Sequence, residues 1–170
     1  MEIHEIIQKT HKAVQENNSR QLSELVTDFG LFLTMKDESK LNATEFNEIC
    51  NLILNESFAK TKNSGAFVYE TYLEFDKLSK DQAEVLFEKI ESINYFNYGN
   101  DEYFTALSDL IARRYPANQT YCLFEKKYRE CPHENWHFCF SGLYALSLEH
   151  QDNDNMVNKA VKLMKEINKS

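Results

Sequence analysis

The chain has 170 residues, with 27 acidic and 19 basic side chains and a formal net charge of −8. Its 12 Phe, 9 Tyr and single Trp exclude an intrinsically disordered chain, which lacks the apolar surface that offsets the entropy of ordering. The acidic balance argues against direct nucleic-acid binding, because neutralising phosphates requires clustered Lys and Arg.

Only 4 Gly and 2 Pro are present, and neither a GxxxxGK nor a GxGxxG motif occurs. Nucleotide-binding α/β folds need glycines where the backbone approaches phosphate, and β-rich folds need them in turns. The N-terminus does not read as a signal peptide, and no apolar run reaches membrane-spanning length. We therefore expect a soluble cytoplasmic protein that contacts no membrane.

The four cysteines are predicted to be reduced thiols in this compartment, mostly acting as small buried hydrophobic residues. They are Cys50, Cys122, Cys131 and Cys139.

Helical periodicity runs through nearly the whole chain and predicts about eight helices. Ser19 is the expected N-cap of the second helix, and Ser79 opens a capping box for a later one. A possible domain break is the loop at 60–65, and a polar connection is expected at 94–100. The expected helices cover 2–16, 19–33, 42 or 44 to 54, 66–78, 79–93, 101–115, 117–131, 133–150 and 154–168.

The predicted fold class is therefore all-α, with residues 1–170 forming a single domain. The short sequence Ala-Leu-Ser occurs at 106–108 and again at 145–147. This offset of 39 residues is close to the roughly 40–47-residue period of HEAT and armadillo repeats. We expect an irregular HEAT-like stack of helical hairpins, and a compact helical bundle is the alternative.

One motif has the form of a catalytic metal site. His133, Glu134 and His137 spell HExxH, in which two histidines one helical turn apart bind zinc and the glutamate activates water. The motif begins directly after Pro132, and no third ligand lies at a recognised spacing. The alternative is a structural helix in which aromatic and aliphatic side chains pack the core, namely Trp136, Phe138, Phe140, Leu143 and Tyr144.

A related possibility is a structural zinc site built from Cys131, His133, His137 and Cys139. Cys139 lies roughly 200° around the helix from His137, at about 100° per residue. One helix therefore cannot present all four ligands together. We predict no metal, no cofactor and no catalytic residue.

The negative charge is concentrated in residues 63–110, which contain ten acidic and three basic side chains. Acidic residues four apart on a helix repel one another by roughly 0.2–0.5 kcal/mol per pair. Such a stretch either keeps the protein in solution or matches a basic partner. The predicted partner-binding residues are Glu70, Glu74, Glu84, Glu88, Glu91, Tyr95, Tyr98, Asp101 and Glu102.

In its size, acidity, helical content and low glycine content, the chain resembles the immunity proteins of bacterial contact-dependent inhibition and related polymorphic toxin systems. The resemblance implies a non-enzymatic inhibitor that binds a basic nuclease-type toxin and blocks it by occlusion. The acidic side chains of 63–110 would then face the Lys and Arg that otherwise hold nucleic acid. The alternatives are a helical-repeat scaffold for another protein and an HExxH zinc metalloprotease.

Overall fold

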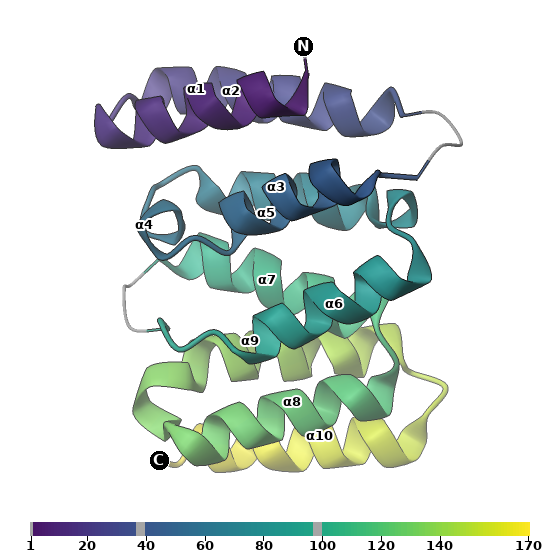
Figure 1. The fold of residues 1–170 in the computed structure, drawn as a ribbon. Helices are drawn as coiled ribbons and strands as arrows, with labels where there is room; N and C mark the ends of the chain where they lie inside the picture. Colours follow the sequence, from purple (N-terminus) through teal and green to yellow (C-terminus); the bar gives the residue numbers. More distant parts are fainter. Residues whose placement is uncertain (1, 37–39, 97–99) are drawn as a thin grey trace. The chain divides into compact units, whose positions relative to one another are not determined.

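The structure, a computed structural model, describes residues 2–36, 40–96 and 100–170. These ranges are helical and contain no strand, which confirms the predicted all-α class (Figure 1). They hold ten α-helices and one short 3-10 helix, η1, rather than about eight helices. The elements are α1 (Ile3–Gln15), α2 (Ser19–Thr34), α3 (Ala43–Ile53), α4 (Glu56–Ala59), α5 (Ser64–Leu73), η1 (Phe75–Lys77), α6 (Lys80–Glu91), α7 (Asp101–Arg114), α8 (Ala117–Glu130), α9 (Pro132–Glu149) and α10 (Asp154–Ile167).

The helix count differs from the expectation partly because a short helix forms directly after α3. Asn55 accepts a hydrogen bond from the Phe58 amide at 2.9 Å and so caps the four-residue helix α4. The loop expected at 60–65 is correspondingly shorter, since α5 already begins at Ser64. The helix expected over 66–78 ends at Leu73 and is followed by η1.

Polar side chains fix several helix starts, and the capping box predicted at Ser79 is confirmed. Asn42 and Ser79 each form a capping box with the third residue of the following helix, which satisfies two backbone N–H groups reciprocally. The cap of α2 is Asn18, one residue before the expected Ser19, and it accepts from the Gln21 amide at 3.1 Å. Asn17 has a positive φ of 51°, and this left-handed residue ends α1.

Packing divides the chain into two compact units, Met1–Tyr95 (unit 1) and Phe96–Ser170 (unit 2). The division falls in the polar connection expected at 94–100, and the loop at 60–63 lies inside unit 1. The single-domain organisation of residues 1–170 stays a prediction.

In unit 1, α1 contacts α2 and α3, and α2 contacts α5. The Glu70 side chain covers Gly30, and the Thr34 hydroxyl donates to Glu74 at 3.3 Å. Because these two contacts keep the same offset in sequence, α2 and α5 run in the same direction. Phe67 lies at the centre of this core, with its ring centroid 5.2 Å from those of both Phe29 and Phe58.

In unit 2, α9 contacts α7, α8 and α10. Thr105 lies 3.1 Å from His137 near the start of α7, and Arg113 donates to Glu149 at 3.1 Å near its end. Helices α7 and α9 therefore run side by side in the same direction. The fully buried rings of Phe124 and Phe138 meet edge to face with centroids 5.2 Å apart.

Candidate functional site

Helix α6 carries the centre of the predicted acidic surface. Its capping box is tied into unit 1, because Gln82 Nε2 donates to the Leu41 carbonyl at 2.9 Å. Leu86, Phe87 and Ile90 are buried on one face. The helical period then places Glu84 and Glu88 on the other side, and both are exposed.

These two glutamates have no cationic partner within salt-bridge distance among the described residues. Other exposed helices of unit 1 pair their acids with a base four residues away. The Nζ–Oε distance is 2.8 Å for Lys9–Glu5 and 3.4 Å for Lys60–Glu56, and Arg20 Nε lies 3.2 Å from Glu24. Exposed pairs of this kind contribute only tenths of a kcal/mol. In α6, Lys80 also lies four residues before Glu84, but the two side chains are not within salt-bridge distance. Glu84 and Glu88 are like charges four residues apart, which is unfavourable by a similar amount.

Glu70 and Glu74 belong to the packing of α2 against α5 and are both half-buried. The Glu70 carboxylate occupies the space that the absent side chain of Gly30 leaves open. Burial, with a smaller contribution from the nearby Glu74 charge, raises the pKa of Glu70. These two carboxylates are therefore less accessible to a partner than those of α6.

The other predicted partner residues fall into three environments. Tyr95 is buried, and its hydroxyl donates to the Leu54 carbonyl at 2.6 Å, so its role in this structure is to pack unit 1. Glu91 is half-buried, and Tyr98 lies outside the described residues. Asp101 and Glu102 are exposed in the first turn of α7, so the predicted acidic stretch is divided between the two units.

The HExxH residues do not converge in unit 2. His133 and Glu134 are exposed in the first turn of α9. His137 is half-buried, and its Nε2 lies 3.1 Å from the Thr105 hydroxyl and 3.3 Å from the Asp101 carbonyl. Within residues 2–36, 40–96 and 100–170, no three His, Cys, Asp or Glu side chains group closely enough to hold a metal ion.

The two cysteines of the Cys/His set, which the helical spacing already argues against, lie in different environments. Cys131 is exposed at the end of α8, whereas Cys139 is buried on α9.

The expectation that α9 buries all five of its named apolar residues is wrong. Phe138 and Leu143 are buried and Phe140 is half-buried, but Trp136 and Tyr144 are 52% and 55% exposed. Helix α9 already contacts three helices through its other faces, so its remaining face stays uncovered. A signal for this was present in the sequence, because Trp136, Phe140, Tyr144 and Leu148 are spaced four residues apart.

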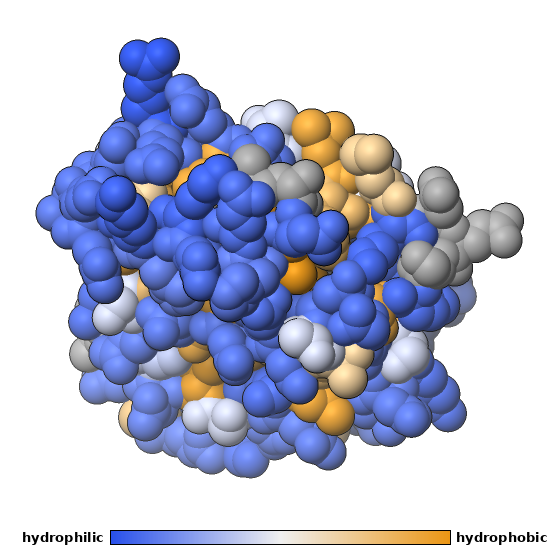
Figure 2. All heavy atoms as spheres, turned by 45° about the horizontal axis from the view of Figure 1, so that its top comes forward, coloured by the Kyte–Doolittle hydropathy of each residue, from blue (hydrophilic) through white to orange (hydrophobic). Residues whose placement is uncertain are grey.

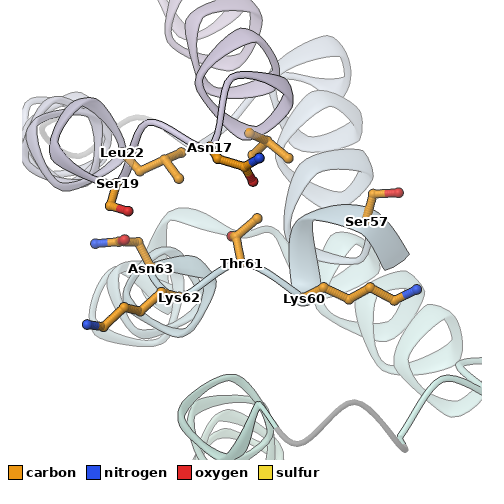
Figure 3. A pocket seen from close by; sticks show the side chains of 9 residues that line it. Asn17, Ser19, Leu22, Ser57, Lys60, Thr61, Lys62 and Asn63 are labelled. Atoms are coloured by element: carbon orange, nitrogen blue, oxygen red, sulfur yellow. The ribbon is translucent and has the colours of Figure 1, made fainter.

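A cavity of about 380 Å³ lies in unit 1 between the α1–α2 turn and the α4–α5 turn (Figure 3). The side chains of Lys60 and Lys62 extend away from its centre in this view. The Oδ1 atom of Asn63 is buried and has no hydrogen-bond partner among the described residues. The lining combines hydroxyl, amide, lysine and aliphatic groups, and it contains no carboxylate, imidazole or thiol. This lining offers no paired acid and base for catalysis.

The cysteines provide a direct test of the burial pattern. Burial raises the pKa of the Cys50 thiol to about 12 and also raises that of Cys139. Because the thiolate is the reactive species, we expect iodoacetamide to modify exposed Cys122 and Cys131 rapidly in the native protein. Cys50 and Cys139 should react only after denaturation. Intact-mass spectrometry over time would measure this, and rapid addition of four labels to the folded protein would contradict it.

No protein-family model, curated protein or solved structure gives a significant match to the chain. None of the helices in the described residues combines the length and apolar content that crossing a bilayer requires. On the face drawn in Figure 2 the surface is mainly hydrophilic, with apolar side chains in separate small groups.

Proposed function

We propose that the protein is a stoichiometric inhibitor that binds a basic protein partner through the acidic surface of α6. The observation that carries this proposal is the exposed pair Glu84 and Glu88, which forms no salt bridge among the described residues of the kind found on α1 and α2, although Lys80 lies four residues before Glu84. An uncompensated like-charge pair costs a little stability. A partner that supplies Lys or Arg would convert that cost into attraction and accelerate association.

The partner class that fits this surface best is a nuclease-type toxin, as for immunity proteins. Such an enzyme carries Lys and Arg to hold nucleic acid, and an acidic helix competes for the same side chains. Occlusion requires no chemistry from the inhibitor. In this proposal the protein acts in the cytoplasm, forms no covalent intermediate and needs no cofactor.

A helical-repeat scaffold is the second candidate, and a specific feature of the fold favours it. In unit 2, α7 runs beside α9, and α8 runs beside α10, where Arg129 forms two hydrogen bonds with Glu166. In unit 1, α2 runs beside α5 in the same way. Parallel stacking of equivalent helices from successive hairpins is typical of HEAT-like repeats, which commonly present surfaces for protein binding.

The inhibitor proposal is tested with the basic proteins encoded beside this gene, each expressed with and without the protein. We expect one of them to inhibit growth when expressed alone. Co-expression of the protein should relieve that inhibition, and the two proteins should bind with one-to-one stoichiometry.

Removing both charges in E84Q/E88Q should slow association by about tenfold at low ionic strength and by less at high salt. Stopped-flow binding would measure this rate. The same variant should be slightly more stable, by about 0.2–0.5 kcal/mol.

The matched control is E16Q/E24Q, which removes two exposed glutamates from the α1–α2 region of the same unit. It changes the net charge by the same amount as E84Q/E88Q. If the location of the charges on α6 matters more than the total charge, the association rate of this control should stay within about twofold of that of the parent protein. Equal slowing by both variants would remove α6 as the binding surface. If no neighbouring basic protein binds, the inhibitor proposal is wrong.

A further inference from the structure

A second surface, on unit 2, has a different character from α6. Trp136, Phe140, Tyr144 and Leu148 follow one another at intervals of four residues along α9. Trp136 is 52% exposed, Tyr144 55% and Leu148 42%, while Phe140 is half-buried. These four side chains, the α9 ridge, span roughly 18 Å at 1.5 Å per residue. Large exposed aromatic residues are the commonest energetic anchors of protein interfaces.

The geometry of the α9 ridge favours a helical occupant. Side chains four residues apart form the ridges that enter the grooves of a neighbouring helix. The ridge extends over about three helical turns, which matches the length of an ordinary recognition helix. Helices α7, α8 and α10 contact α9 and leave this row uncovered.

Exposed negative charge lies near the Trp136 end of the ridge. Trp136 lies next to His137, with ring centroids 5.3 Å apart, and His137 Nε2 lies 3.3 Å from the carbonyl oxygen of Asp101 in the first turn of α7. The exposed carboxylates of Asp101 and Glu102 therefore lie near the Trp136 end. At the other end, Glu149 is neutralised by Arg113 at 3.1 Å. A partner would thus meet exposed negative charge at the Trp136 end.

We propose that the α9 ridge binds an amphipathic helix of a partner protein, whose apolar face covers the ridge and whose Lys or Arg residues lie at the Trp136 end. Charge complementarity selects this occupant, because the acidic end disfavours an acidic helix. This inference does not depend on the acidic surface of α6, since it concerns a different unit and a different kind of contact.

Trp136 supplies a specific measurement, because it is the only tryptophan in the chain. Three synthetic peptides of about 16 residues would be titrated while the Trp136 emission is recorded. The first carries leucines on one helical face and lysines elsewhere, the second replaces each lysine with glutamate, and the third scrambles the first. We expect a saturable blue shift with the first peptide only, because only that peptide both covers the indole and matches the charge.

Matched variants then distinguish peptide binding at the α9 ridge from non-specific binding to any exposed apolar side chain. Y144A/L148A should weaken binding of the first peptide by at least about tenfold. The control Y69A/L73A removes the same residue types, at the same spacing, from α5 in unit 1, where they are 47% and 45% exposed. It should leave the affinity within about twofold. D101N/E102Q should weaken binding of the lysine peptide. It should also reduce the ratio between the protein's affinities for the lysine peptide and the glutamate peptide.

Three results would overturn the proposal. One is equal binding of the basic and acidic helices, and another is unchanged affinity in Y144A/L148A that still shows native circular dichroism. The third is a dimer in sedimentation equilibrium that Y144A/L148A converts to a monomer, because the ridge would then be covered by a second copy of the chain. The inhibitor proposal for α6 would survive all three.

Discussion

Replacing Phe67 with alanine is expected to lower the free energy of unfolding by about 3–5 kcal/mol, as large aromatic truncations in cores do. Phe67 is fully buried, and its ring contacts those of Phe29 and Phe58, with centroids 5.2 Å from each. The substitution leaves a cavity where α2, α4 and α5 meet. Urea denaturation followed by circular dichroism would measure the loss, and hydrogen exchange should locate it in unit 1.

Tyr69 is the control for this experiment, because it lies two residues away on the exposed side of α5. Its side chain is 47% exposed, and its ring centroid lies 5.6 Å from that of Tyr72. Tyr69→Ala should therefore cost no more than about 1 kcal/mol. Similar losses in both variants would show that the assigned faces of α5 are wrong.

Gly142→Ala is expected to destabilise the protein by about 2 kcal/mol, even though alanine is the better helix former. A Cβ atom at this position would lie 2.1 Å from Cζ of Phe124 and 2.3 Å from its Cε1. The Phe124 ring is fully buried and packs against Phe138, so it cannot move aside cheaply. Helices α8 and α9 would have to separate. Thermal unfolding would detect the change as a lower midpoint.

Gly30→Ala provides the comparison, since the same substitution meets a different neighbour. The added Cβ would lie 2.6 Å from Oε2 of Glu70, which is the end of a flexible, half-buried side chain. That carboxylate can swing toward solvent, and the gain in helix propensity offsets the adjustment. We expect the stability to stay within about 1 kcal/mol of the parent protein. A loss as large as that of Gly142→Ala would mean that Glu70 is rigidly held.

Local signals in the sequence predicted the secondary structure well where the relevant interactions are local. The predicted capping box at Ser79 is present, because a cap needs only a side chain and an amide three residues away. The same reasoning placed the start of α2 one residue late, since Asn17 in the left-handed region lets Asn18 take the capping position. Helix α4 was missed because a four-residue helix has too short a pattern to detect.

The sequence alone determined the all-α class, most helix positions and the exposure of Glu84 and Glu88, because α6 is clearly amphipathic. Only the tertiary structure decided which acids are partly enclosed, as Glu70 is by its packing over Gly30. It also showed that Tyr95 is buried and that Trp136 is exposed. Helix α9 carries apolar residues on every side, so its periodicity cannot indicate which face the neighbouring helices cover. That assignment depends on contacts between residues far apart in the chain, which local patterns do not encode.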